Sequence, residues 1–239
     1  MYQSWRSLLF LHWKFPPEAI RPLLPPALKL DTFEGEAYVG LVPFTTQGVR
    51  PAGLPSVPCL SNFHETNVRT YVQIEGRNPG VWFFSLDAAN PLAVALARRW
   101  FALPYYYARM SLDADLDDNP PGRRITYRSE RRPDSPINAA SFISAQIAAV
   151  PPAPVAVGTL DHFLIERYLL YTVRRGRIYR GQVHHPSYPV QPAEILACEE
   201  SLLAASQISR PDEAPIVHFS GGVDVEIFSL HPEPGSARR

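Results

Sequence analysis

The stretch Phe63-His64-Glu65-Thr66-Asn67-Val68-Arg69-Thr70-Tyr71-Val72 is the most informative strand of the chain. Side chains alternate between the two faces of a strand, so one face carries Glu65, Asn67, Arg69 and Tyr71. In an antiparallel sheet such a polar face is usually turned to water. If the sheet curls into a barrel, the same row lines an interior in which polar groups need partners. Glu65 and Arg69 lie ~13 Å apart along the strand, so each needs a partner on a neighbouring element.

The segments around this stretch also have the composition of strands. The sequence has 26 prolines, which helix interiors and central strands exclude, together with 12 phenylalanines and 11 tyrosines. Turn signals at residues 75–80 and 174–176 predict two hairpins. Strands are expected at residues 5–14, 37–44, 63–74, 81–86, 123–132, 139–150, 168–173, 177–184, 216–220 and 223–230. The architecture predicted from these elements is mainly β.

Helices are expected to be few and short. The clearest spans residues 90–101, with Asn90 as N-cap, Pro91 at the first helical position and two arginines near its end. Shorter helical turns are expected at residues 17–21, at 160–167 with a cap near Thr159, and at 199–207. Residues 47–60 are rich in glycine and proline and predict a long loop, which in a compact domain is more often functional than incidental.

Composition limits the class of protein. The chain has 239 residues, 46% of them hydrophobic, and its formal net charge is zero. We therefore expect one domain over residues 1–239 with a frayed tail at 231–239, and no nucleic-acid partner. No apolar run reaches the ~20 residues of a membrane helix and no secretory signal is evident, so a cytoplasmic protein is expected. Cys59 and Cys198 are the only cysteines, and the sequence leaves open whether they meet.

The usual catalytic and metal-binding motifs are absent from the sequence. It contains no glycine-rich phosphate loop, no Gly-x-Ser-x-Gly elbow and no His-Glu-x-x-His pair. His184-His185 are adjacent on an expected strand, where side chains diverge, and no third ligand follows. We therefore expect neither a metal nor a cofactor. The remaining candidate site residues are polar groups on β elements: Glu65, Asn67, Arg69, Tyr71, Asn90, Tyr105 and Tyr106.

The tyrosines at the end of the main helix form a second feature, Leu103-Pro104-Tyr105-Tyr106-Tyr107-Ala108-Arg109. On an extended backbone Tyr105 and Tyr107 point to one side and Tyr106 to the other. They either reach into a cavity or fill space as buried tyrosines that bond through their hydroxyls. The stretch itself leaves both interpretations open.

Several segments resemble the bacterial DUF2071 (YqjF-like) family. They include Tyr38-Val39-Gly40-Leu41-Val42-Pro43-Phe44, the Glu65-Thr66-Asn67-Val68-Arg69-Thr70-Tyr71 strand, Leu103-Pro104-Tyr105-Tyr106 and Val217-His218-Phe219-Ser220. This family is in turn similar to acetoacetate decarboxylase. The resemblance implies an α+β, mainly β fold: an antiparallel β-barrel or curled sheet with a central cavity and a few short helices.

The resemblance also implies a loss of the decarboxylase chemistry. The cavity glutamate of the decarboxylases falls at Glu65, but their second acid falls near Asn90. Their Schiff-base lysine and its neighbouring lysine fall at Tyr105 and Tyr106. A Schiff base needs a primary amine, and the only lysines, Lys14 and Lys29, lie elsewhere. Decarboxylation through an iminium is therefore predicted to be absent.

Three hypotheses about function follow, and we rank the first above the second. The first is a protein that binds a small molecule, with Asn67, Arg69, Tyr71 and Asn90 as ligand contacts. The second is an enzyme acting on a small oxo or aromatic acid without covalent catalysis, of lyase, hydratase or isomerase type. There Glu65 is the base, Tyr105 or Tyr106 the acid, and Arg69 the carboxylate anchor. The third is a packed barrel in which these groups are structural. A homo-oligomer is left open.

Overall fold

The strands of the protein form one long, curled sheet. The structure is a computed structural model that describes residues 1–51, 53, 55–57, 61–115 and 123–233. Its 13-stranded sheet has the order β13-β10-β9-β5-β6-β7-β8-β11-β12-β1-β3-β4-β2. The strands are β1 (Tyr2–Phe15), β2 (Lys29–Leu30), β3 (Ala37–Arg50), β4 (Phe63–Ile74), β5 (Arg77–Ala88), β6 (Tyr105–Asp115), β7 (Arg124–Arg131), β8 (Ala140–Ile147), β9 (Leu169–Arg174), β10 (Arg177–His184), β11 (Val190–Glu200), β12 (Ile216–Ile227) and β13 (His231–Pro232).

Two further pairings curl this sheet on itself. β5 also pairs with β4, and β10 also pairs with β12, so strands from distant parts of the order lie side by side. Most neighbours are antiparallel, as predicted, but β5 pairs in parallel with both β6 and β9. The parallel pair β5–β6 has a physical reason: the chain crosses between the two strands through a helix, a connection that parallel neighbours require.

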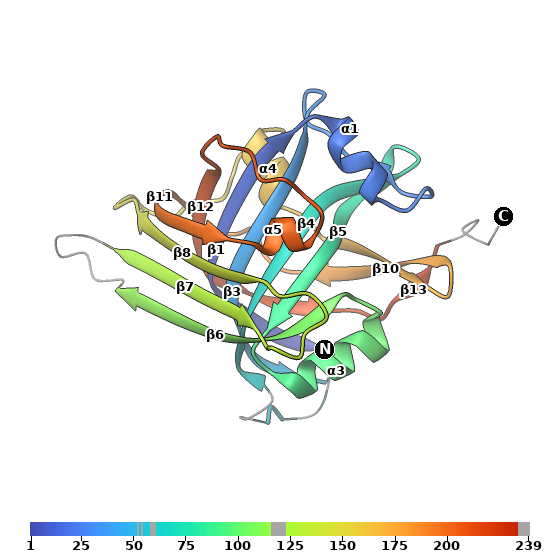
Figure 1. Cartoon of the computed structure of the whole chain (residues 1–239), viewed down its shortest axis with the longest axis horizontal. Helices are drawn as coiled ribbons and strands as arrows, with labels where there is room; N and C mark the ends of the chain where they lie inside the picture. The colour runs from blue at the N-terminus through green and yellow to red at the C-terminus, as the bar shows by residue number, and fades with distance from the viewer. Residues whose placement is uncertain (52, 54, 58–60, 116–122, 234–239) are drawn as a thin grey trace.

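Five helices accompany the sheet in the described residues: α1 (Pro17–Ile20), the 3-10 helix η1 (Arg21–Leu23), α3 (Pro91–Phe101), α4 (Leu160–Ile165) and α5 (Leu202–Ala205). The predicted caps of the two most relevant helices are confirmed. Asn90 Oδ1 accepts from Leu92 N and Ala93 N at the start of α3, and Thr159 Oγ1 accepts from His162 N at the start of α4. In Figure 1 α3 lies beside the N-terminus, at the end of the molecule opposite α1.

The first strand is buried on both faces, which explains its run of apolar residues. Leu9 and Leu11 pack into a core with β3, β7, β8 and α5. Leu8 and Phe10, on the other face, pack into a second core with α4 and β12. The second core surrounds the cavity described below.

Several sequence expectations are corrected. β3 continues to Arg50, so the loop predicted at 47–60 begins after that residue. Residues 52, 54 and 58–60, including Cys59, lie outside the described residues. The helix predicted at 199–207 is the end of β11 followed by the four-residue α5. β11 itself was missed, because its pairing with β8 overrides a local pattern rich in alanine and leucine.

The last two predicted strands, 216–220 and 223–230, are one continuous strand, β12. Gly222 lets it bend, because its φ of +128° is a conformation that other residues rarely adopt. The tail also begins later than predicted, since His231 pairs with Arg180 in β13, and residues 234–239 lie outside the described residues. The single domain over residues 1–239 stays a prediction. None of the helices in the described part of the chain is long and apolar enough to cross a membrane.

Candidate functional site

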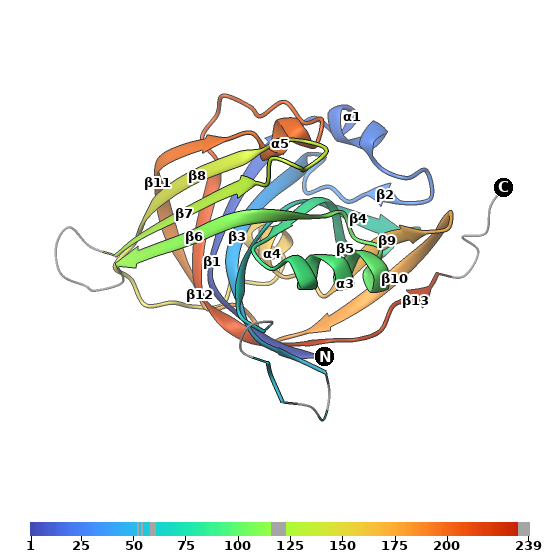
Figure 2. The same cartoon turned by 60° about the horizontal axis from the view of Figure 1, so that its bottom comes forward.

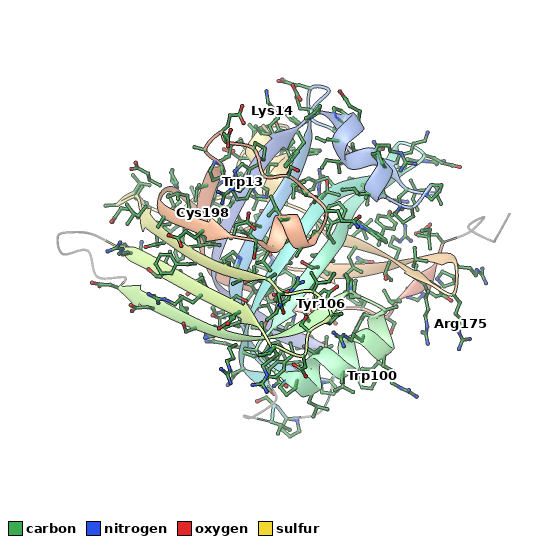
Figure 3. The ribbon with its side chains drawn as sticks, viewed as in Figure 1. Trp13, Lys14, Trp100, Tyr106, Arg175 and Cys198 are labelled. Atoms are coloured by element: carbon green, nitrogen blue, oxygen red, sulfur yellow. The ribbon has the colours of Figure 1, made fainter. Side chains whose placement is uncertain are left out.

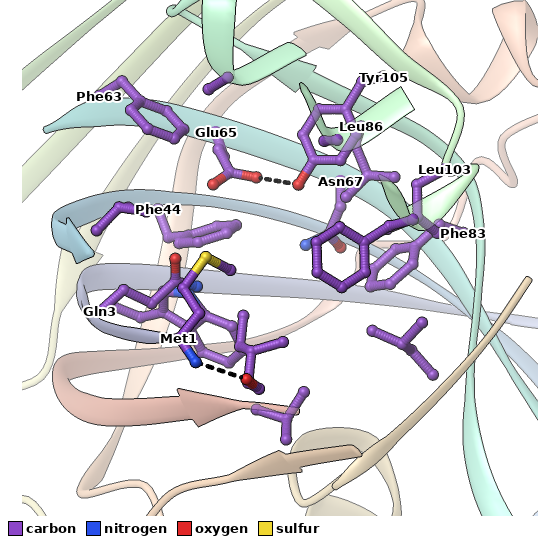
Figure 4. Close-up of a pocket in the computed structure, with 18 of the residues that line it drawn as sticks. Met1, Gln3, Phe44, Phe63, Glu65, Asn67, Phe83, Leu86, Leu103 and Tyr105 are labelled. Carbon is purple, nitrogen blue, oxygen red and sulfur yellow. Dashed lines mark hydrogen bonds between the residues drawn. The ribbon is translucent and has the colours of Figure 1, made fainter. Parts of the chain in front are cut away.

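A cavity of about 390 Å³ opens inside the curl of the sheet. This volume lies within the usual range for sites that bind small molecules. Most of its walls are apolar, and Figure 4 shows part of the lining, including Phe44, Phe83 and Leu103. The polar side chains among them are few: Gln3, Ser61, Glu65, Asn67, Arg69, Tyr105, Arg167 and Tyr188, with the indole of Trp5.

The polar face of β4 supplies three of these groups. Glu65, Asn67 and Arg69 all line the cavity together with Phe63, as the alternation of the strand predicts. On the neighbouring strand the alternation is interrupted, because Phe84 is an extra residue between the pairs Val68–Ser85 and Arg69–Phe83. Phe83 and Leu86 can therefore both line the cavity.

Glu65 is a buried carboxylate held by two neutral donors. Thr46 Oγ1 donates to Oε1 at 2.7 Å, and Tyr105 OH donates to Oε2 at 2.9 Å. Burial raises the pKa of Glu65, and the two hydrogen bonds offset this only in part. Burial and the adjacent carboxylate raise the pKa of Tyr105 well above its usual value, so its hydroxyl keeps its proton and stays a donor. Such a pair can hold or transfer a proton inside an apolar cavity.

Arg69 carries a charge that no carboxylate in the described part of the chain balances. Its Nη2 donates to Leu164 O at 3.1 Å, and its guanidinium lies 5.6 Å from the centre of the Phe10 ring. The ion pairs found within the described residues include none with Arg69. A half-buried guanidinium without a counter-ion favours an anion in the space it faces.

Other polar atoms at the cavity also lack partners. Asn67 Oδ1, Trp5 Nε1 and Arg69 Nε are buried and make no hydrogen bond within the described part of the chain. Buried polar groups are nearly always satisfied in folded proteins. These atoms therefore indicate a site that a polar ligand, or water, completes.

Tyr71 lies on the same face of β4 but is not among the residues lining the cavity. Its hydroxyl donates to Leu164 O and lies 2.8 Å from His12 Nε2, which must then be the donor. Burial lowers the pKa of His12 well below its usual value, so this histidine is neutral with its proton on Nε2. The bond to Leu164 O ties α4 to the sheet and the bond from His12 links β4 to β1, so the hydroxyl of Tyr71 is engaged by the fold.

Tyr106 and Asn90 also lie outside the cavity lining. The Tyr106 ring lies under the guanidinium of Arg131, 3.8 Å from the ring centre, and Arg131 is bonded to Asp87. Asn90 uses its side-chain oxygen to cap α3. Of the seven candidates, Glu65, Asn67, Arg69 and Tyr105 therefore converge on one cavity, whereas Tyr71, Tyr106 and Asn90 do not.

Several lining residues were missed by sequence reasoning. Arg167 follows α4 and pairs with Asp31 at 3.1 Å, while Tyr188 precedes β11 and is buried against Phe10. Thr46, which does not line the cavity itself, bonds Glu65 from the part of β3 that extends beyond the predicted strand 37–44. No local pattern marks these residues, because long-range pairing alone brings them to β4. A neighbouring strand was, however, the expected source of a partner for Glu65.

Neither lysine lies at the cavity. Lys14 Nζ is 3.6 Å from Glu36 Oε1, and Figure 3 shows Lys14 at the end of the molecule opposite Trp100, which lines the cavity. Lys29 lies on β2 and is not a lining residue. Among the described residues, no three His, Cys, Asp or Glu side chains form a group that could hold a metal ion. Cys198 is a half-buried free thiol.

Replacing Glu65 by glutamine is expected to change how stability depends on pH. Because the pKa of Glu65 is raised in the folded protein, the folded state keeps this proton to a higher pH than the unfolded chain does. Between the two pKa values the free energy of unfolding of the wild type therefore falls as pH rises, and Glu65→Gln lacks this fall. Below the unfolded pKa of about 4.3 the carboxyl is protonated in both states and contributes no difference.

Urea unfolding of both proteins from about pH 4 to about pH 8 measures the effect. The exposed Glu194, changed to glutamine, is the control and should track the wild type across this range. A constant difference between wild type and Glu65→Gln at every pH would show that Glu65 titrates like an exposed carboxyl.

The chain belongs to the DUF2071 family, a family of uncharacterized conserved proteins, whose profile matches residues 2–224. It is similar to the Uncharacterized protein YqjF of Bacillus subtilis (strain 168), with 36% identity over 230 residues, 96% of this chain and 91% of YqjF. The family resemblance stated from the sequence is thereby confirmed.

Solved structures with the same fold confirm the acetoacetate decarboxylase-like architecture. The enduracididine biosynthesis enzyme MppR, complexed with pyruvate, matches with a TM-score of 0.63 at 12% identity, over 97% of this chain and 89% of MppR. An acetoacetate decarboxylase-like enzyme from Sphingomonas wittichii RW1 gives 0.62 at 12%, over 97% and 92%. Acetoacetate decarboxylase from Legionella pneumophila gives 0.58 at 11%, over 96% and 86%. At these identities the similarity shows the fold alone.

Proposed function

We propose that this chain is a small-molecule-binding protein whose cavity takes an organic acid. The observation that carries the proposal is Arg69, a half-buried guanidinium at the wall of an apolar cavity with no carboxylate partner in the described residues. A ligand carboxylate would balance this charge and could use two parallel N–H donors of the guanidinium. MppR, which has the same fold, was solved with pyruvate, an oxo acid, and this supports an acid as ligand.

Native mass spectrometry of the protein as purified tests this proposal. We expect a retained small molecule that leaves on denaturation and whose extracted mass fits a carboxylic acid. The Arg69→Leu protein should be recovered without it, whereas the Arg99→Leu protein, changed at an exposed position of α3, should retain it. A wild-type protein that retains no ligand and binds no member of a panel of organic acids would contradict the proposal.

An enzyme without covalent catalysis is the second candidate, and the Glu65–Tyr105 pair favours it. Its carboxyl has a raised pKa and lies beside a protonated phenol in a mostly apolar cavity. Glu65 could then move a proton to or from a substrate while Tyr105 stabilises an oxygen and Arg69 anchors a carboxylate or enolate. Tyr106 has no part in this mechanism. If the protein is an enzyme, Glu65→Gln would keep the ligand affinity but lose turnover. If the protein only binds its ligand, the wild type shows no turnover either.

The absence of a lysine from the cavity lining supports a protein that is not an acetoacetate decarboxylase. We expect that acetoacetate followed by borohydride leaves no adduct on Lys14 or Lys29, because neither ε-amine reaches the cavity and Lys14 is exposed to water beside Glu36. Peptide mapping after reduction makes the measurement. An adduct on either lysine together with release of carbon dioxide would restore the iminium mechanism.

A further inference from the structure

We propose that the cavity takes an amphipathic monocarboxylic acid head first, with the carboxylate on Arg69 and an apolar tail that leaves along α3. This inference rests on the proposed function and adds the class and the orientation of the ligand. It follows from how side chains are distributed along the cavity: two guanidinium groups lie near α4, and a row of apolar side chains lies along α3.

The charge lies near α4. Arg69 and Arg167 line the cavity near the end of α4, together with the buried side chain of Ile165, the last residue of that helix. The charge of Arg167 is already balanced by Asp31 at 3.1 Å. Arg69 is therefore the guanidinium that a ligand anion can approach, and its contact with Leu164 O fixes it at the end of α4.

The mouth is apolar although it faces water. Leu92, Leu96 and Trp100 all line the cavity from α3, and they are 44%, 36% and 59% exposed. They are spaced four residues apart and so form one row along the helix. Val57, also at the cavity, is 47% exposed. Single exposed apolar residues are ordinary, but a row that rims a cavity marks a binding surface.

The distance between the two ends sets the length of the ligand. Glu65 is bonded to Tyr105, which follows the end of α3, whereas Arg69 lies farther along β4 beside Leu164. The two β4 positions are ~13 Å apart. Phenyl and alkyl side chains such as Phe44, Phe83 and Leu103 line the cavity, and Figure 4 shows them around Glu65 and Asn67. A short oxo acid on Arg69 would leave the α3 row uncovered, and a polar tail would gain nothing there.

Calorimetric titration with butanoate, octanoate and dodecanoate, kept below micelle-forming concentrations, tests the inference. We expect affinity to rise by about three- to fourfold for each added methylene that is buried, and then to level off once the tail has passed α3. The double variant Leu96→Gln/Trp100→Gln should lower the affinity for dodecanoate by about tenfold or more and shrink the dodecanoate-to-butanoate ratio. The control Ala95→Gln changes an exposed residue of the same helix that does not line the cavity and should leave this ratio unchanged.

Equal affinities for the three acids would overturn this inference and leave the proposed function standing. Binding of none of them would overturn both. If the double variant changes the sedimentation of the protein but not the affinity ratio, the α3 row is a contact between copies of the chain, and the inference is wrong.

Discussion

Changing Asp87 to asparagine is expected to lower the free energy of unfolding by about 3–5 kcal/mol. Arg131 donates to Asp87 from both Nε and Nη2, at 3.0 and 2.8 Å, and the two side chains are only 1% and 0% exposed. Removing the carboxylate charge leaves a buried guanidinium that faces a neutral amide and the ring of Tyr106, 3.8 Å from the ring centre, and no carboxylate that the structure shows balances it. Since folded domains are stable by about 5–15 kcal/mol in total, a large share of the stability would be lost.

Asp224 provides a matched control for this change. It also pairs with an arginine, Arg6, at 2.5 Å, but its side chain is 78% exposed. Asp224→Asn should cost at most about 1 kcal/mol, because water screens the pair and solvates the partner that remains. Denaturant unfolding of the three proteins gives the comparison. Equal losses for the two variants would mean that burial does not set the strength of the Asp87–Arg131 pair.

Changing Arg69 to leucine is expected to weaken the binding of dodecanoate by about 2–5 kcal/mol, or roughly thirtyfold to several-thousandfold. The reason is that Arg69 is a lining guanidinium with no carboxylate partner among the described residues, so in Arg69→Leu the ligand carboxylate would enter the apolar cavity without this partner. The free energy of unfolding of Arg69→Leu should fall much less than its free energy of binding. The reason is that the wild-type protein bears the cost of desolvating the Arg69 charge, and the variant does not.

Dodecanol separates the loss of charge from a loss of shape. The neutral alcohol has the same tail and no carboxylate, so its affinity should differ little between wild type and Arg69→Leu. The exposed Arg99, changed to leucine, controls for a general change of charge. If acid and alcohol lose affinity equally in Arg69→Leu, the arginine shapes the cavity and does not bind the carboxylate.

Much of the site could be predicted because alternation along a strand is a local property. The row of Glu65, Asn67 and Arg69 was read from the period of β4, and the structure brings all three to one cavity. The caps of α3 and α4 were likewise visible, since capping depends on one side chain and the next turn of helix.

Other parts could not be read from any local pattern. The strand β11 was missed because its segment is rich in alanine and has no local strand pattern. Its pairing with the neighbours β8 and β12 makes it a strand. Arg167 and Tyr188 reach β4 from about a hundred residues along the chain. Tyr71 lies on the same face of β4 as the cavity residues, but its hydroxyl bonds to Leu164 O of α4 and its side chain does not line the cavity.

The sequence by itself determined that β4 presents a polar row, that Tyr105 and Tyr106 point apart, and that no lysine follows Pro104. Only the tertiary structure decided that the polar row faces inward, that Tyr105 and not Tyr106 meets Glu65, and that Arg69 has no carboxylate partner in the described residues. The physical reason is that the direction of a side chain relative to its own strand is set locally. Which face becomes an interior depends on how the sheet curls, through pairings such as β4–β5 and β10–β12.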